Sequence, residues 1–227
     1  MIVTVNAGHT PTSPGTTGLL DEVTINRPTR DRVIAELQAR GHEVYDCTAP
    51  DWMAYPDELD RQVAIANEGD ATLAVSIHAN AGGGTGPEVW YWDGDDDGKV
   101  VATKISANLS RALGLPDRGV KADSGDLGFL RETGMTAVLV ELCFCDRQED
   151  YDAWIAVPWG DISGAICDGI EGKDWERGVE PTPDPIPDPD PDTGRLYRVQ
   201  IGAYRNRENA DAAKQAAINA GFEAIIC

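Results

Sequence analysis

The stretch Ala71-Thr-Leu-Ala-Val-Ser-Ile-His78-Ala-Asn80 is a mostly apolar, β-branched run that leads into a histidine. Two other stretches have the same form, Met1-Ile-Val-Thr-Val-Asn-Ala-Gly-His9 and Thr136-Ala-Val-Leu-Val-Glu141. Short apolar runs of this kind are typical of buried strands. In open α/β sheets, ligands bind outside the carboxyl ends of the strands. We therefore expect His9, His78 and Glu141 to meet at one edge of a sheet, which indicates a metal-assisted hydrolase.

Strands and helices alternate along the first 175 residues. The predicted strands are 1–6, 43–47, 71–77, 87–92 and 136–145, and the predicted helices are 27–40, 56–68, 100–113 and a C-terminal section that holds Ile162, Ile166 and Ile170. Strand 87–92 follows a glycine-rich turn and is expected to lie beside strand 71–77. This order predicts an α/β fold: a mostly parallel, mixed sheet of about six strands with helices on both faces.

The composition changes sharply after this region. Residues 176–194 include a run with proline at nearly every second position, interspersed with aspartate, which predicts an extended linker. It separates the domain 1–175 from a tail, 195–227, whose pattern predicts a short strand–helix–strand unit. So short a unit buries too little apolar surface to be stable alone. We expect it either to belong to a longer module or to associate with a copy of itself or with the main domain.

Composition excludes several classes of function. The 227 residues carry a formal net charge of −20, with 39 acidic against 19 basic residues, which argues against nucleic-acid binding. No apolar run reaches the length of a membrane span, and no signal peptide precedes the first strand, so synthesis in the cytoplasm is expected. The five cysteines are odd in number and do not suggest a disulfide framework.

A catalytic zinc usually has three protein ligands and one open position. His9 and His78 are two candidates, and Glu22, which follows a Ser/Thr/Gly/Pro-rich loop, is a third. The neighbouring Asp21 is an alternative, and a carboxylate in a first helical turn also compensates the helix dipole. Zn²⁺ suits two imidazoles and a carboxylate. Glu141, at the end of an apolar strand, is then the expected proton carrier.

These residues resemble the zinc-dependent N-acetylmuramoyl-L-alanine amidases of the amidase type 3 family. The resemblance covers about residues 1–172 and rests on Asn6-Ala-Gly-His9, Glu22 with Asn26, Ser76-Ile-His78-Ala-Asn80, Gly86-Pro-Glu88-Val-Trp-Tyr91, Leu127-Gly-Phe-Leu-Arg131 and Val138-Leu-Val-Glu141. It implies that His9, Glu22 and His78 bind zinc, that Glu141 is the catalytic residue, and that the substrate is the amide between muramic acid and L-alanine in peptidoglycan. After Glu141 the chain departs from the common family pattern and is closer to some phage endolysins.

Three further residues are candidates for roles around this site. Asn80 and Arg131 are plausible substrate contacts, an amide and a guanidinium fork, although both can also be structural. Glu88 is a candidate for a residue that orients a metal ligand without binding the metal itself.

The tail resembles a sporulation-related (SPOR) repeat, a peptidoglycan-binding module, of which one half is present. Our first hypothesis is a wall-lytic amidase, either a phage endolysin or a mother-cell autolysin, because both are made without a signal peptide and reach the wall late. Two alternatives stay open: another zinc hydrolase acting on the wall, such as a peptidase or a deacetylase, and a non-catalytic wall-binding protein.

Overall fold

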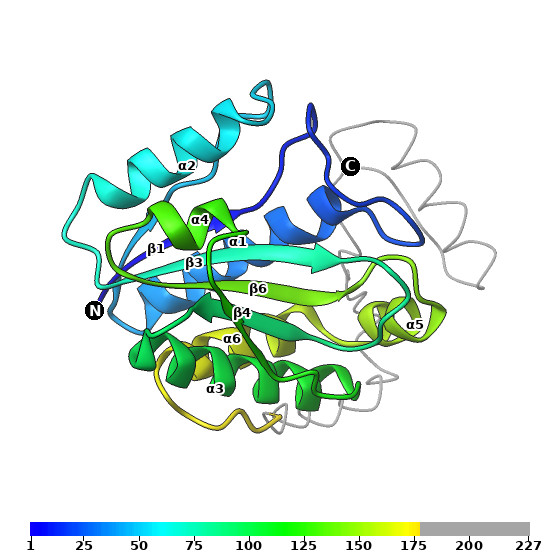
Figure 1. Ribbon diagram of the computed structural model, residues 1–227. Helices are drawn as coiled ribbons and strands as arrows, with labels where there is room; N and C mark the ends of the chain where they lie inside the picture. Colours follow the sequence, from blue (N-terminus) through cyan, green and yellow to red (C-terminus); the bar gives the residue numbers. More distant parts are fainter. Residues whose placement is uncertain (178–227) are drawn as a thin grey trace, which may run out of the picture. The chain divides into compact units, whose positions relative to one another are not determined.

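A six-stranded sheet forms the centre of residues 1–177, the part of the chain that this computed structural model describes (Figure 1). Its strands are β1 (Ile2–Ala7), β2 (Glu43–Asp46), β3 (Leu73–Asn80), β4 (Glu88–Trp92), β5 (Val120–Asp123) and β6 (Thr136–Phe144), in the order β2-β1-β3-β6-β4-β5. All neighbouring strands are parallel except β4 and β6, which are antiparallel. The predicted α/β fold with a mostly parallel, mixed sheet is therefore confirmed.

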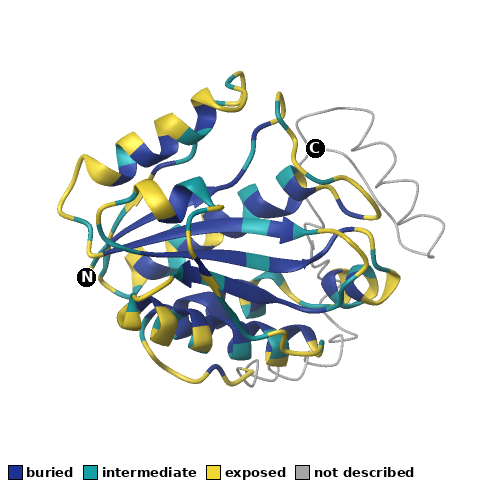
Figure 2. Cartoon of the chain, in the orientation of Figure 1, coloured by how far each residue is buried: buried dark blue, intermediate teal, exposed yellow. Residues whose placement is uncertain are grey.

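The helices cover both faces of this sheet. They are α1 (Glu22–Ala39), α2 (Asp57–Asn67), α3 (Asp96–Leu113), α4 (Gly128–Glu132), α5 (Gln148–Ala156) and α6 (Trp159–Ile170). Helices α1, α3 and α6 pack together on one face, and the shorter α2 and α4 lie on the other (Figure 1). The sheet between them is buried along most of its length (Figure 2).

Alternation of side chains along the strands gives each face its own core. Val75 belongs to the larger cluster beneath α1, α3 and α6, whereas Ala74 and Leu139 belong to the smaller cluster beneath α2 and α4. Successive side chains of a strand point to opposite faces. His78 on β3 and Glu141 on β6 therefore project toward the α2 and α4 face, where a thinner layer of helices covers the sheet.

The chain divides into two units, Met1–Gly178 and Val179–Cys227. Almost all of the predicted linker, 176–194, and the whole predicted C-terminal unit, 195–227, lie outside the described residues. The predicted association of that unit with a copy of itself lies outside them as well.

The glycine-rich turn suggested that β4 lies beside β3, but the structure places it elsewhere. It lies between β6 and β5 and runs antiparallel to β6. A turn between two strands fixes neither their pairing nor their direction when it is long enough to cross a third strand. Residues 81–87 are long enough, and the prediction of a β3–β4 neighbour pair was therefore wrong.

Helix α1 begins at Glu22, earlier than the predicted start at residue 27, so Pro28 falls inside the helix. The first turn is held by contacts outside the helix, including the bond that the backbone N–H of Glu22 donates to the carbonyl of Thr16. Such contacts with the preceding loop override the local signal of a proline near a helix start.

The four cysteines among residues 1–177, Cys47, Cys143, Cys145 and Cys167, are free and buried. None of the helices in residues 1–177 combines the length and the apolar character that crossing a membrane requires.

The contact between α3 and α6 provides a stability test. A Cβ added at Gly169 would lie 2.6 Å from Cγ1 and 2.8 Å from Cα of Ile105, so Gly169→Ala should destabilise the fold by about 1–3 kcal/mol through overpacking. Gly160, in the same helix, is exposed and has no atom within 4 Å of an added Cβ, so Gly160→Ala should leave stability unchanged or slightly raised. Urea unfolding monitored by circular dichroism measures both. Equal stability of the two variants would contradict the close packing described for Gly169.

Candidate metal and catalytic site

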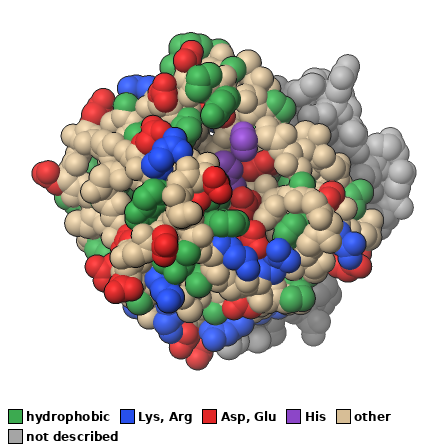
Figure 3. Space-filling view, in the orientation of Figure 1, with side chains coloured by type: hydrophobic (Ala, Val, Ile, Leu, Met, Phe, Trp, Pro, Cys, Tyr) green, Lys and Arg blue, Asp and Glu red, His purple; other side chains and the backbone are tan. Residues whose placement is uncertain are grey.

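A cavity of about 480 Å³ opens on the face of the sheet that carries α2 and α4. Its floor includes the side chains of His9, Glu22, His78 and Glu141, and its walls include residues of α2 and α4. The surface view shows histidine side chains in this hollow with acidic side chains beside them (Figure 3). The structure thus brings together at one edge of the sheet the four residues that the sequence singled out.

Three side-chain atoms from different segments converge at the floor of the cavity. Nε2 of His9 lies 3.6 Å from Oε1 of Glu22, and Nδ1 of His78 lies 3.0 Å from the same oxygen. One ligand atom from each of the three residues lies within 4.8 Å of the other two. The two imidazole rings are in an edge-to-face arrangement with their centroids 5.0 Å apart.

The three residues reach this point in different ways. His78 is part of β3 and lies directly beside Glu141 in the β3–β6 register. His9 lies beyond the end of β1 with a φ of 62°, a left-handed conformation that a residue other than glycine adopts only when its surroundings impose it. Glu22 is the first residue of α1. Sheet pairing therefore places one imidazole, and a strained loop places the other.

Two glycines allow these side chains to approach. A Cβ at Gly8 would lie 2.0 Å from Cε1 of His78, so the backbone of the His9 loop rests directly on the His78 ring. A Cβ at Gly15 would lie 2.4 Å from Oε2 of Glu22 and 2.5 Å from Cδ2 of His9. Any larger residue at either position would fill the space that the ligand side chains occupy.

The carboxylate of Glu22 is buried, with 1% of the residue exposed. Oε1 accepts hydrogen bonds from the backbone N–H of Ala79 at 3.0 Å and from Asn26 at 3.4 Å, and Oε2 accepts one from the backbone N–H of Thr16 at 2.9 Å. Burial by itself raises the pKa of Glu22, but the hydrogen bond with His78 and the two nearby imidazoles outweigh it and lower the pKa to about 2. Glu22 is thus held as an anion.

The two histidines differ in their affinity for a proton. Burial lowers the pKa of His9, and the adjacent His78 lowers it further. Burial also opposes protonation of His78, but its hydrogen bond and charge interaction with Glu22 raise the pKa of His78 above the ordinary value. Without a metal, the site therefore favours a proton on His78 that is shared with the Glu22 carboxylate through their hydrogen bond.

These residues fit a zinc ion. Ligand atoms about 2.0–2.1 Å from a tetrahedral zinc lie about 3.4 Å from one another. The two measured separations, 3.0 and 3.6 Å, bracket that value. Two imidazoles and one carboxylate are a donor set suited to Zn²⁺, and three protein ligands leave a fourth position for a substrate or water. The open cavity above the three atoms provides access to that position.

Glu141 lies next to this group without belonging to it. It pairs with His78 across the β3–β6 ladder, lines the cavity, and has an Oε2 atom that lacks a hydrogen-bond partner among the described residues. Burial raises the pKa of Glu141 to about 7, and the charges of Glu22 and Glu88 act in the same direction, against the opposing effect of His78. A carboxyl group with a pKa near neutrality can both accept and donate a proton.

Of the three further candidates, Asn80 and Arg131 line the cavity and Glu88 does not. Glu88 pairs with Glu141 in the β4–β6 register, and its carboxylate accepts hydrogen bonds from Asn80 at 2.9 Å and from Arg118 at 2.8 Å. Asn80 lines the cavity and also accepts a bond from the backbone N–H of Ala81. Among the described residues, Glu88 thus hydrogen-bonds to Asn80 and Arg118 and to neither His9 nor His78.

Arg131 lines the outer part of the cavity, on α4, with its side chain 46% exposed. Its guanidinium donates to the carbonyl of Gly125 and to Glu132, both at 2.6 Å. Its position at the cavity is compatible with a substrate contact, but its donors are turned toward protein groups.

Sequence reasoning missed Glu58, which also lines the cavity and is 4% exposed. A signal was present, because Glu58 lies on the same helical face as Gln62 and Ala66, all of them buried residues of α2. A carboxylate in the buried stripe of an amphipathic helix requires a partner.

Comparison with known proteins adds to this geometry. A model of the N-acetylmuramoyl-L-alanine amidase family matches residues 3–172, and a model of the SPOR domain matches residues 191–226. The sporulation-specific N-acetylmuramoyl-L-alanine amidase of Bacillus subtilis (strain 168) is 29% identical over 169 residues, which are 74% of this chain and 61% of that protein. An uncharacterized protein of Clostridium perfringens (strain 13 / Type A) is 33% identical over 186 residues, 80% of this chain and 55% of that protein. The chain thus spans little more than half the length of these curated relatives.

Solved structures of similar fold include two catalytic domains. That of the CD27L endolysin targeting Clostridia Difficile has a TM-score of 0.70 and 27% identity, covering 78% of this chain and 99% of that one. That of CwlV, an N-acetylmuramoyl-L-alanine amidase from Bacillus (Paenibacillus) polymyxa var. colistinus, has a TM-score of 0.64 and 29% identity, and the match covers 74% of this chain and 95% of that one.

The contact between Gly8 and His78 makes a direct prediction about metal binding. Gly8→Ala would place a methyl group 2.0 Å from the His78 ring, so the ring must move and the variant should bind zinc at least about tenfold more weakly. Gly69→Ala is the matched control, because a Cβ there meets no atom within 4 Å. Zinc competition with a chromophoric chelator measures both affinities. Equal affinity of the Gly8→Ala and Gly69→Ala variants would contradict the placement of His78.

The raised pKa of Glu141 predicts how stability depends on pH in the metal-free chain. The folded-state pKa of about 7 exceeds the ordinary value of 4.5, so the folded state binds the proton more tightly. The stabilisation of the folded state by this proton on Glu141 is complete below about pH 4.5 and is lost as the pH rises through about 7. With a chelator present, the wild type should lose stability relative to Glu141→Gln between about pH 4.5 and 8. Urea unfolding at several pH values tests this, and a constant difference between the two proteins would refute the shift.

Proposed function

The chain belongs to the N-acetylmuramoyl-L-alanine amidase family, as its motifs predicted, and we propose that residues 1–172 hydrolyse the amide between muramic acid and L-alanine in peptidoglycan. The observation that carries this proposal is the convergence of His9, Glu22 and His78 beside Glu141, on the floor of an open cavity. The intact set of four residues also argues against a non-catalytic wall-binding protein.

Zinc is the metal that we propose for this site. His9 through Nε2, His78 through Nδ1 and Glu22 through Oε1 would hold the ion, since these three atoms face one another. When bound, the ion supplies a Lewis acid that polarises the scissile carbonyl and makes water acidic near neutral pH. The hydrogen bonds from Ala79 and Thr16 to Glu22 keep that carboxylate oriented toward the two imidazoles.

Glu141 is the residue that we propose for proton transfer. Its carboxylate takes a proton from the attacking water and gives it to the nitrogen of the leaving L-alanine. The pKa of about 7 supports both halves of this exchange, because a catalytic group works best when its pKa is close to the operating pH. Its Oε2 atom, which has no hydrogen-bond partner among the described residues, is the oxygen that we propose carries this proton.

Asn80 and Arg131 are proposed substrate contacts. Asn80 uses one amide hydrogen on Glu88, which leaves the other for a substrate carbonyl. Arg131 stands at the exposed rim of the cavity, where a stem-peptide carboxylate can compete with Glu132 for its guanidinium. Glu88 is proposed as an orienting residue for Asn80.

The cell wall is the proposed place of action. The match to a SPOR domain over residues 191–226 supports an additional contact with peptidoglycan. The matched relatives include a protein named as an endolysin of Bacillus phage SPP1 and a sporulation-specific amidase. Either role, phage endolysin or autolysin, agrees with this proposal.

Digestion of purified cell wall tests the reaction itself. The wild type should release muropeptides with new N-terminal L-alanine amines, detected by mass spectrometry, without new reducing sugar ends. Removal of the metal with a chelator should abolish release, and added zinc should restore it. Release of acetate would identify a deacetylase instead, and new amines only within the stem peptide would identify a peptidase.

Substitution of Glu141 tests its assigned role. Glu141→Gln should lower the rate by about 10²–10⁴-fold with zinc content unchanged, because the amide cannot carry the proton. Glu149→Gln is the matched control, since the Glu149 side chain is 61% exposed and lies outside the cavity. Metal analysis and wall-digestion rates are measured on all three proteins. A fully active Glu141→Gln variant would remove Glu141 from the mechanism.

A further inference from the structure

A second buried carboxylate faces the side of the His9 ring that points away from the metal centre. Oε1 of Glu58, in the first turn of α2, lies 3.7 Å from Nδ1 of His9. The other ring nitrogen, Nε2, lies 3.6 Å from Glu22. The ring of His9 therefore stands between two carboxylates, one near each nitrogen.

Two atoms at this contact have no hydrogen-bond partner among the described residues, Nδ1 of His9 and Oε2 of Glu58. Burying polar groups without partners is unfavourable. A bridging water needs its two partners about 4.5 Å apart, since each hydrogen bond is about 2.8 Å long. The 3.7 Å gap between Nδ1 of His9 and Oε1 of Glu58 is too short for a bridging water and longer than a direct hydrogen bond, so a direct bond requires a small shift of one of the two groups.

We propose that Glu58 is a positioning residue for His9: its carboxylate accepts a hydrogen bond from the Nδ1–H group and thereby leaves the lone pair of Nε2 free for the cation. A neutral imidazole has one donor and one acceptor nitrogen, so the partner of one nitrogen decides the role of the other. Metal-binding histidines commonly donate their second N–H to a carboxylate or a carbonyl. This inference rests on the metal centre of the proposed function and adds a residue to it.

His9 needs such support more than His78 does. His78 is fixed within β3 by pairing with β1 and β6, whereas His9 lies beyond the end of β1 in a left-handed conformation. Its ring orientation therefore depends on neighbours outside the sheet. Glu58 is suited to this role because it projects from a helix, whose backbone is rigid.

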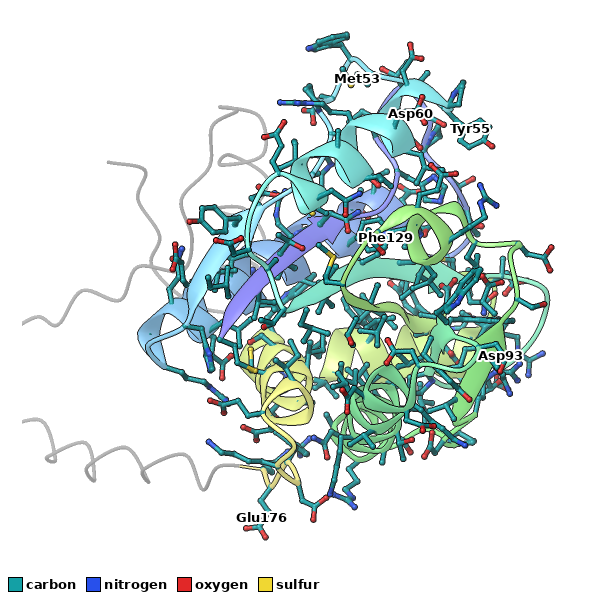
Figure 4. All side chains as sticks on the ribbon, turned by 60° about the vertical axis from the view of Figure 1, so that its left-hand side comes forward. Met53, Tyr55, Asp60, Asp93, Phe129 and Glu176 are labelled. Carbon is teal, nitrogen blue, oxygen red and sulfur yellow. The ribbon has the colours of Figure 1, made fainter. Side chains whose placement is uncertain are left out.

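The start of α2 is tied to the loop that carries His9. The hydroxyl of Thr10 donates to the carbonyl of Met53 at 2.5 Å, and the hydroxyl of Thr12 donates to the carbonyl of Asp51 at 2.8 Å. These bonds hold the segment before α2 against the His9 loop, so Glu58 and His9 keep their relative position. Figure 4 shows Met53 and Tyr55 on this segment, next to α2.

One other acceptor competes for the ring. Burial lowers the pKa of His9, and the backbone of Ser13 acts in the opposite direction and raises it. If Ser13 positions the ring alone, removing the Glu58 carboxylate has no effect on His9. The two possibilities therefore predict different results for the same substitution.

Zinc affinity of the full chain, measured by chelator competition, tests the inference without relying on catalysis. Glu58→Leu removes the acceptor and keeps an apolar side chain of similar size, and zinc should bind 10–100-fold more weakly. Glu58→Gln keeps an oxygen that can accept, so the loss should be less than about tenfold. Asp60→Asn is the matched control, because Asp60 lies on the same helix and is exposed, and its affinity should stay within about twofold (Figure 4).

Nuclear magnetic resonance of the zinc-loaded chain tests the hydrogen bond itself. The wild type should show a His9 Nδ1–H proton protected from exchange with water, and Glu58→Leu should lose that protection while Asp60→Asn keeps it. Circular dichroism melting with excess chelator checks that each variant is folded. If Glu58→Leu does not fold, the partial loss of zinc affinity expected for Glu58→Gln decides the test.

The outcomes separate this inference from the function on which it rests. A wild-type chain that does not bind zinc would reject the metal centre and the role of Glu58 together. A wild type that binds zinc, with a folded Glu58→Leu variant of equal affinity and an equally protected Nδ1–H, would reject the role of Glu58 alone and assign the ring to Ser13.

Discussion

The carboxylate of Glu22 is the contact on which the arrangement of the site depends. It is almost fully buried, and it joins the first turn of α1 to Thr16 in the preceding loop and to His78 and Ala79 of β3. A buried anion is tolerated only when its oxygens accept hydrogen bonds and a positive charge is close by. The need to satisfy this one group therefore explains why the long loop after His9 closes over the edge of the sheet.

The sheet supplies the second fixed element. His78 and Glu141 are opposite each other in a parallel ladder, and Glu88 is opposite Glu141 in the adjacent antiparallel one. Their separations are set by backbone hydrogen bonds. The distance between the proposed proton carrier, Glu141, and the proposed metal ligand, His78, is therefore set by the sheet and not by the loops around it. The larger core beneath α1, α3 and α6 supports the opposite face of the same strands.

Much of this fold follows from local sequence, and the parts that do not have identifiable reasons. Strands β1, β3 and β6 are continuous apolar runs, and α3 is strongly amphipathic, so each was predictable. Strand β5 has only four residues, Val120–Asp123, and α4 only five, too few to show a periodicity. Helix α5 begins with Gln148-Glu-Asp150 and presents little apolar surface. The pairing of β4 with β6 depends on tertiary contacts that no local pattern records.

The residues of the site likewise divide into those that local sequence predicts and those that only the folded chain reveals. His9, His78 and Glu141 were predictable because each follows or ends an apolar run. Glu22 could not be separated from Asp21 without the family resemblance, and the structure places Glu22, the one of the two that is buried, beside the histidines. Glu58 escaped notice because its partner lies 49 positions away along the chain, on a loop whose path depends on Glu22. Residues whose role comes from a helix folding over a sheet are not visible in local spacing.

The reversed direction of β4 couples two connections at one edge of the sheet. Because β4 is antiparallel to β6, its first residue lies at the edge where β3 and β6 end, and residues 81–87 cross that edge as a rim. The backbone N–H groups of Gly82 and Gly83 are anchored to Asp146, which belongs to the connection after β6. Further along the same segment, the backbone N–H of Gly86 donates to Asp150 of α5, and a Cβ added at Gly84 would lie 2.3 Å from the ring of Phe144. The segment is therefore fastened to the residues that follow β6 at three backbone positions, so a change of length in one of these connections requires a matching change in the other.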